Sequence, residues 1–177
     1  ELGRHAVDMQ RSLRELVEKD ALTGLYNRRY GEKRLKQVQK DADSYGMPFC
    51  IAIGDIDYFK HVNDTYGHEW GDRVLTQIAR IMAERMRREG YAARWGGEEF
   101  LLVFMDQGLQ DAAETLRKLQ NEIRDTEFTY NEKEKFRVTM TFGICESSGE
   151  NTDELLRCAD NRLYAGKKGG RDRIIQE

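Results

Sequence analysis

Glu98 and Glu99 stand side by side where the chain is expected to turn, and paired acids at a turn can bind a metal ion. Gly96 and Gly97 precede them, and an apolar run at residues 100–105 follows. The pattern predicts a β-hairpin whose glycine pair supplies the positive φ of a tight two-residue connection. Two adjacent carboxylates repel each other by roughly 1 to 4 kcal/mol, depending on the effective dielectric, and a divalent cation removes that cost.

A second acidic pair ends the apolar run at residues 49–53. Asp55 and Asp57 flank Ile56 there, so strand alternation sends both carboxylates to one side. We expect the hairpin to lie next to this strand, so that three or four carboxylates converge, as in two-metal phosphoryl-transfer sites. Oxygen ligands of this kind favour Mg²⁺ over zinc or copper. The simpler alternative is that the aspartates only cap a strand and a turn.

The polar stretch that follows carries groups suited to a nucleotide. Lys60 can place a point charge near a phosphate, while Asn63 and Asp72 offer an amide and a carboxylate to a base edge. A carboxylate that accepts from N1 and N2 of guanine rejects adenine, which lacks those donors. Alternatively, Asp64 or Asp72 caps the following helix.

A basic turn lies near the end of the chain. Lys167 and Arg171 are separated by a segment that contains Gly169 and Gly170, and this flexible turn can hold a triphosphate tail. The alternative is a solvated helix end. The three histidines, which we interpret as structural or substrate-adjacent, lack zinc-ligand spacing: His5, His61 and His68.

Hydrophobic periodicity predicts the elements that must position these groups. The sequence predicts a polar helix ending near Tyr45, a strand at 49–53, an amphipathic helix at 70–88, the hairpin, a helix around 112–123, a strand over 136–144, a helix over 155–163 and a short strand at 173–175. Asp111 and Glu114 are spaced as an N-cap and its N3 partner. The order predicts an α+β domain with a mostly antiparallel sheet.

Composition limits the classes of partner. The 177 residues suit one domain, and 39% hydrophobic with 34% charged residues indicates a globular protein. The net charge of -3 predicts no nucleic acid partner. No membrane-length apolar run or signal-peptide pattern is present, so we expect a cytoplasmic domain. Three scattered cysteines, Cys50, Cys145 and Cys158, are interpreted as reduced structural thiols.

The first 19 residues form a separate unit in this interpretation. Leu2, Ala6, Met9, Leu13 and Leu16 have coiled-coil spacing, which predicts a linker helix that pairs with a second copy. A helix packed on its own domain is the alternative. Because the chain starts at Glu rather than Met, we expect it to come from a longer protein with an upstream sensor, which could be membrane-anchored.

Taken together, the motifs resemble those of the GGDEF domains, the diguanylate cyclases, in a GGEEF variant. The resemblance covers residues 20–177 and includes the stretches at 20–29, 55–60, 63–68, 96–100 and 164–171. It implies a fold similar to the nucleotidyl-cyclase and polymerase palm. It also implies condensation of two GTP molecules into cyclic di-GMP, with release of two pyrophosphates.

The resemblance implies roles for the acidic cluster. Asp55, the Ile56 carbonyl and Glu98 would bind metal, with Glu99 completing the shell of the second of two Mg²⁺ or Mn²⁺ ions. Glu98 would also promote deprotonation of the attacking 3′-hydroxyl, and Lys60 would stabilise transition-state charge.

It implies substrate-binding roles as well. Asn63 and Asp72 would read guanine, His68 would line the nucleotide site, and Lys167 and Arg171 would hold the terminal phosphates. Each domain would hold one GTP, so two copies must face each other, and the N-terminal helix would raise their effective concentration.

One departure concerns feedback inhibition. Many family members carry an Arg-x-x-Asp product-binding motif before the hairpin, and the matching residues here are Arg87 and Gly90. The inhibitory site is therefore expected to be incomplete. The main rival function is a non-catalytic module that binds GTP or cyclic di-GMP.

Overall fold

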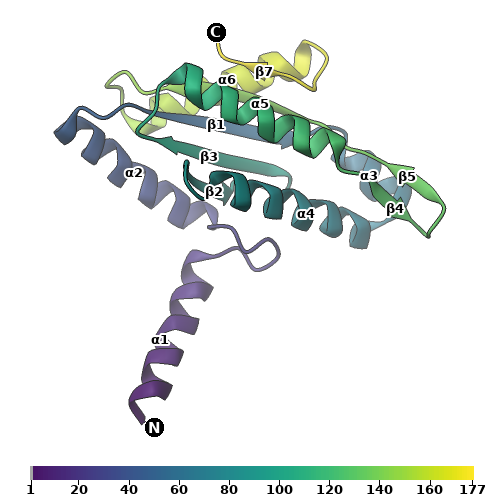
Figure 1. The fold of residues 1–177 in the computed structure, drawn as a ribbon, viewed down its shortest axis with the longest axis horizontal. Helices are drawn as coiled ribbons and strands as arrows, with labels where there is room; N and C mark the ends of the chain where they lie inside the picture. Colours follow the sequence, from purple (N-terminus) through teal and green to yellow (C-terminus); the bar gives the residue numbers. More distant parts are fainter. Residues whose placement is uncertain (1) are drawn as a thin grey trace.

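A central five-stranded sheet organises the computed structural model, which describes residues 2–177 (Figure 1). The strand order is β2-β3-β1-β6-β7, and all neighbours are antiparallel except β6 and β7. The strands are β1 (Phe49–Ile56), β2 (Gly90–Arg94), β3 (Glu99–Met105), β6 (Met140–Glu146) and β7 (Ile174–Ile175). The predicted α+β class with a mostly antiparallel sheet is confirmed.

Helices cover both faces of this sheet. They are α2 (Arg28–Tyr45), α3 (Phe59–Tyr66), α4 (His68–Met86), α5 (Leu109–Asp125) and α6 (Thr152–Lys168), and they follow α1 (Leu2–Glu18), which lies apart from the sheet. One apolar core lies between the sheet and α3, α4 and α5, and a second lies between the sheet and α2 and α6. The predicted helices near residues 28–45, 70–88 and 112–123 are present, although α4 begins and ends two residues earlier than expected.

Alternation along β1 decides which face each side chain meets. Ile51 and Ile53 belong to the core beneath α2 and α6, whereas Cys50 and Ala52 belong to the core beneath α4 and α5. Asp55 continues the odd-numbered series, so its carboxylate lies on the α6 side. The fold thereby directs the first acid of the site toward the C-terminal end of α6.

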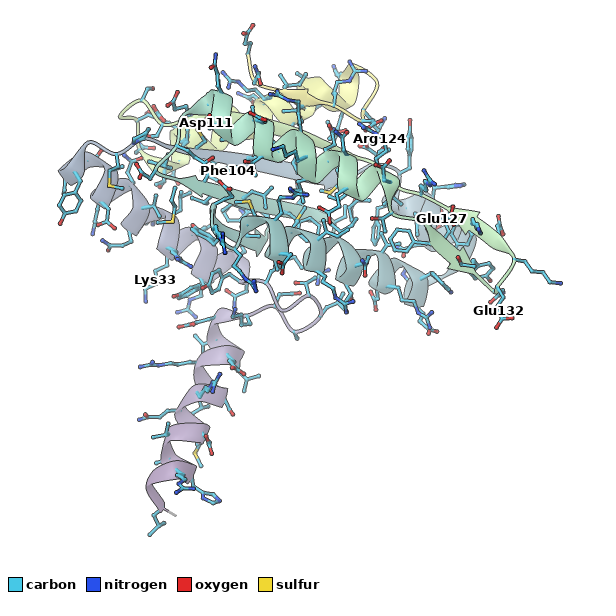
Figure 2. The ribbon with its side chains drawn as sticks, in the orientation of Figure 1. Lys33, Phe104, Asp111, Arg124, Glu127 and Glu132 are labelled. Carbon is cyan, nitrogen blue, oxygen red and sulfur yellow. A yellow bond between two sulfur atoms is a disulfide. The ribbon has the colours of Figure 1, made fainter. Side chains whose placement is uncertain are left out.

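The predicted strand over 136–144 is divided in the structure. Phe136 ends β5 (Glu134–Phe136), which pairs with β4 (Phe128–Tyr130) in a separate two-stranded hairpin. Its ring stacks on Tyr66 with centroids 4.1 Å apart, so tertiary contact takes it out of the main sheet. Figure 2 shows this hairpin extending from the domain, with Glu127 and Glu132 labelled.

The predicted cap of α5 is wrong. Gly108 is the N-cap, and Asp111 lies inside the first turn, where its charge favours the helix dipole (Figure 2). Glu114 forms an ion pair with Lys118, with 3.7 Å between its Oε1 and the lysine Nζ. The capping-box spacing therefore predicted a start of α5 that was too late, because Asp111 is already the third residue of the helix.

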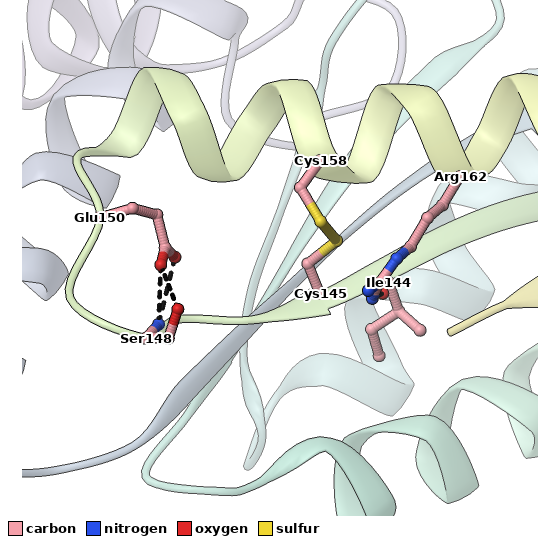
Figure 3. The surroundings of a disulfide bond; sticks show 6 residues. All are labelled: Ile144, Cys145, Ser148, Glu150, Cys158 and Arg162. Carbon is pink, nitrogen blue, oxygen red and sulfur yellow. Dashed lines mark hydrogen bonds between the residues drawn. A yellow bond between two sulfur atoms is a disulfide. The ribbon is translucent and has the colours of Figure 1, made fainter. Parts of the chain in front are cut away.

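The prediction of three reduced thiols is also wrong. Cys145 of β6 and Cys158 of α6 form a disulfide, with Cα atoms 6.5 Å apart (Figure 3). Cys145 faces α6 because it belongs to the core on that side of the sheet, and Cys158 packs against the same core. Cys50 is a buried free thiol, and burial raises its pKa to about 12.

Helix α1 extends away from the sheet and its covering helices (Figure 1). It contains no buried residue, and Leu2, Met9, Leu13 and Leu16 are between 55% and 91% exposed. A helix packed on its own domain would bury these apolar side chains, so the structure does not support that alternative. Among residues 2–177, no helix is both long and apolar enough to cross a membrane.

Candidate active site

The two acidic motifs meet at adjacent strand ends, as the sequence predicted. Asp55 of β1 lies opposite Glu99 of β3 in the antiparallel register. The next residue, Ile56, donates its backbone N–H to the carbonyl of Glu98 at 3.2 Å. Asp55 and Glu98 line the same cavity of about 280 Å³. The acids on which the functional interpretation depends therefore share one face and one cavity.

The loop that carries the glutamates differs from the predicted two-residue turn. Four residues, 95–98, connect β2 and β3, and the N–H groups of Trp95 and Gly96 both donate to the Glu99 carbonyl, at 2.8 and 3.2 Å. Neither Gly96 nor Gly97 adopts a left-handed φ. A Cβ on Gly96 would lie 2.9 Å from Glu99 Oε2, at the flexible end of that side chain, so a larger residue would only have to displace the carboxylate.

Burial and mutual repulsion disfavour ionisation of the cluster. Burial, reinforced by the charge of Asp55, raises the pKa of Glu98 and of Glu99. The pKa of Asp55 is also raised, because desolvation outweighs its ion pair with Lys167, whose Nζ lies 2.6 Å from Asp55 Oδ2. A bound cation would reverse each of these penalties.

Asp57 does not join this cluster through its carboxylate. Its two oxygens accept hydrogen bonds from the hydroxyls of Thr139 and Thr141 at 2.7 and 2.6 Å, and Oδ2 also accepts from the N–H of Asp172 at 3.0 Å. Of the three or four carboxylates expected to converge, Asp55 and the two glutamates remain, because Asp57 is engaged with two threonine hydroxyls and one backbone N–H.

The remaining donors suit a hard divalent cation. No group of three or more His, Cys, Asp or Glu side chains within residues 2–177 is gathered into a preformed metal site. Asp55, the Ile56 carbonyl and Glu98 nevertheless offer oxygen atoms around one cavity, with Glu99 beside them. The ammonium group of Lys167 pairs with Asp55, which shows that this position favours positive charge, and a metal ion bound to Asp55 would share or replace that contact.

Basic residues gather at the same cavity. Its lining includes Lys60 from the first turn of α3, Lys167 from the last turn of α6, and Arg171 from the turn beyond it. Tyr58 also lines the cavity, with the Arg171 guanidinium carbon 4.7 Å from its ring centroid. Cations and acids that line one cavity suit a phosphate ester bound through metal ions.

The residues predicted to read a base lie outside this cavity, on α3 and α4. Asn63 packs against Gly71, where a Cβ would lie 1.9 Å from Asn63 Oδ1. That oxygen is buried and is the one buried side-chain N or O atom in the described chain without a hydrogen-bond partner. His68 and Asp72 are exposed near it in sequence, at the start of α4. Gly67 caps that helix without a side-chain bond, so neither Asp64 nor Asp72 caps it.

Two residues near Glu99 were missed from the sequence. Arg28 stacks on Trp95 with its guanidinium carbon 4.4 Å from the ring, and its charge lowers the pKa of Glu99. Asp160 acts in the opposite direction and raises the pKa of Glu99. Asp160 lies two helical turns before Lys167, and this spacing on one face of α6 was the available signal.

Arg94 joins the acidic loop to the segment after α1. Its guanidinium contacts Asp20 at 3.2 Å and donates to the Gly97 carbonyl at 2.9 Å. Burial alone would raise the pKa of Asp20, but hydrogen bonds from Thr23 and the charge of Arg94 lower it. The loop is thus tied to the N-terminal side of the domain.

The residues at the expected inhibitory motif do not form an Arg-x-x-Asp pair. Arg87 and Arg88 help line a separate cavity of about 390 Å³, with Glu89. Gly90 opens β2, and a Cβ there would lie only 1.9 Å from the Val103 carbonyl oxygen. The strand pairing therefore leaves no room for an aspartate at this position without a backbone shift.

Comparison with known proteins agrees with this geometry. The family described as diguanylate cyclase, GGDEF domain, matches residues 17–173. The response regulator PleD of Caulobacter vibrioides is 36% identical over 164 residues, which cover 91% of this chain and 36% of PleD. The chain thus spans little more than a third of that relative.

Solved structures share the fold. Diguanylate cyclase SiaD, solved with its activator SiaC from Pseudomonas aeruginosa, has a TM-score of 0.89 at 36% identity and covers 99% of this chain and 68% of SiaD. The coiled coil and GGDEF domain of DgcB from Caulobacter crescentus, solved with c-di-GMP, has a TM-score of 0.93 at 29% identity, covering 98% and 93%. This chain belongs to the diguanylate cyclase family of GGDEF domains.

Proposed function

We propose that this chain condenses two GTP molecules into cyclic di-GMP and two pyrophosphates, in a metal-dependent reaction between two copies of the domain. The observation that carries the proposal is the shared cavity, where Asp55 and Glu98 face Lys60, Lys167 and Arg171. A cavity lined by both acids and cations matches the needs of phosphoryl transfer to a hydroxyl.

Asp55, the Ile56 carbonyl, Glu98 and Glu99 would hold Mg²⁺ or Mn²⁺, two ions per site. Bound there, the metal would neutralise phosphate oxygens and lower the pKa of the attacking hydroxyl. The oxygen donor set and the raised pKa of each carboxyl group support this assignment.

The protein groups divide the remaining work. Glu98 accepts the proton of the 3′-hydroxyl. The hydroxyl oxygen at the same time forms a bond to the α-phosphorus of the second GTP. The bond from that phosphorus to the bridging oxygen breaks, and pyrophosphate leaves. Glu98 lines the cavity together with Asp55, which supports its role in this proton transfer. Lys60 stabilises the charge that develops, while Lys167 and Arg171 hold the terminal phosphates.

Asn63, Asp72 and His68 form the proposed base site. The unpartnered Oδ1 of Asn63 is an acceptor for an N–H donor of the base, and guanine offers such a donor at N2. The carboxylate of Asp72 would accept from N1 and N2 together. Adenine would leave both acceptors unsatisfied, which costs about 1 to 3 kcal/mol for each buried group.

Each copy would supply one nucleotide, so activity requires two facing domains. The exposed apolar residues of α1 support pairing through this helix in the longer protein. Control of that pairing by an upstream sensor belongs to the same proposal.

The test is incubation of the protein with GTP and Mg²⁺, followed by chromatography of the products. We expect cyclic di-GMP from the wild type and none from Glu98→Ala, with Glu84→Ala, an exposed α4 substitution, as the control. Binding of GTP or cyclic di-GMP without turnover would instead support the rival signalling module. A different cyclic nucleotide would contradict the role given to Asp72.

A further inference from the structure

We infer that Tyr58 is a positioning residue for Arg171 and that its ring holds the guanidinium where the terminal phosphates would lie. The inference rests on the proposed function, since that function assigns Arg171 to those phosphates. Tyr58 belongs to neither the acidic cluster nor the base site, and it follows directly after Asp57.

Both partners have unusual backbone conformations. Tyr58 has φ 55° and ψ 35°, and Arg171 has φ 63°, in the left-handed region that bulky residues rarely adopt. Residues in this region are strained and persist only where the surroundings hold them. Two of them in contact, from segments distant in sequence, point to a joint role.

Asp57 supplies the connection that brings these segments together. Its carboxylate accepts the N–H of Asp172 at 3.0 Å, and that same N–H lies 3.0 Å from the Thr141 hydroxyl oxygen. The Asp172 carboxylate in turn pairs with Arg124, 2.7 Å from its Nη2. The turn that carries Arg171 is therefore fixed to the end of β1.

The ring completes the arrangement. The Arg171 guanidinium carbon lies 4.7 Å from the Tyr58 ring centroid, within cation–π range. Tyr58 is 64% exposed, and it lines the same cavity as Lys167 and Arg171. A guanidinium held on a ring keeps fewer rotamers, and so loses less entropy when it binds phosphate.

The experiment measures binding rather than turnover. The probe is guanosine 5′-[α,β-methylene]triphosphate with Mg²⁺, compared with GMP, by calorimetry on the full chain. We expect Tyr58→Ala and Tyr58→Gly to bind the triphosphate about three- to fivefold more weakly, the effect of losing one exposed cation–π contact, with GMP unchanged. Tyr58→Phe keeps the ring and should bind like the wild type.

Two comparisons separate positioning from other roles. Tyr58→Gly accepts the left-handed conformation without strain, so weak binding by this variant reports loss of the ring rather than misfolding. In an Arg171→Ala background, Tyr58→Ala should have no further effect. Tyr164, 60% exposed with the Lys168 Nζ 4.9 Å from its ring centroid, is the matched control.

The outcomes distinguish the inference from the proposed function. Equal triphosphate affinity of Tyr58→Ala and wild type, or equal weakening of GMP, would overturn the positioning role alone. A wild type that binds the triphosphate but forms no cyclic di-GMP from GTP would overturn the proposed function alone. No triphosphate binding by the wild type would overturn both.

Discussion

The surroundings of Glu98 disfavour its ionised form. Burial and the nearby charge of Asp55 raise its pKa above the ordinary value of 4.5. A carboxyl group whose pKa is raised by folding stabilises the folded state while protonated. That contribution is lost as the pH rises from below the unfolded pKa and through the folded one. The metal-free site is therefore a source of instability near neutral pH.

Glu98→Gln should remove this pH-dependent loss. We expect the unfolding free energy of the wild type to fall relative to that of Glu98→Gln as the pH rises from about 4 to about 7, and Mg²⁺ to reduce the fall. Urea unfolding at several pH values, with and without Mg²⁺, measures the difference, and Glu84→Gln serves as the control. A difference independent of pH would contradict the assigned environment of Glu98.

The loop between β2 and β3 depends on contacts made by other elements. Arg94 bridges Asp20, just after α1, and the Gly97 carbonyl, just before Glu98. Asn27, at the N-cap of α2, donates its side-chain amide to the Val17 carbonyl of α1 at 2.8 Å. The end of α1 and the acidic loop thus share one hydrogen-bonded segment.

Asp20→Asn should therefore impair catalysis at a distance from the cavity. We expect about a tenfold lower kcat for cyclic di-GMP formation, equivalent to ~1.4 kcal/mol of lost loop positioning, with little change in KM. Steady-state kinetics measure the effect, and Arg29→Ala, an exposed change in the same segment, is the control. Equal kcat values for Asp20→Asn and wild type would show that the bridge is only a surface ion pair.

A second prediction at the scale of helices and strands concerns the disulfide between β6 and α6. It closes a short loop, with a sequence separation of 13, so reduction should lower the unfolding free energy by about 3 kcal/mol. Cys158→Ser should show the same loss without added reductant. Thiol titration of the unfolded, unreduced wild type should find Cys50 alone; reactive thiols at all three cysteines would contradict the pairing.

At the scale of the whole molecule, the proposed pairing of two copies assigns a role to α1. Its exposed apolar side chains include Leu13 at 55% and Leu16 at 78%. Replacing both with Glu should lower specific activity at low protein concentration about tenfold or more, because pairing loses its effective concentration. The loss should shrink as protein concentration rises, measured together with mass by light scattering. Full activity of this variant at low concentration would remove α1 from the mechanism.

Sequence patterns predicted where the acidic strand ends lie but not the contacts around them. Apolar runs located β1 and the hairpin, and alternation put Asp55 on the side where Lys167 meets it. The Cys145 disulfide and the departure of Phe136 from the main sheet depend on which elements pack together. Such contacts leave no periodic signal, so a single sequence could not predict them.

The alternation of β1 also limits how this protein can vary. Ile53 and Asp55 share the α6 side, and the residue between them faces the opposite core. One extra amino acid inserted between them would point the carboxylate into the apolar core beneath α4 and α5. The residue register of β1 is thus as essential to the chemistry as the acid itself. Insertions and deletions should be tolerated in the β4–β5 hairpin but not in β1.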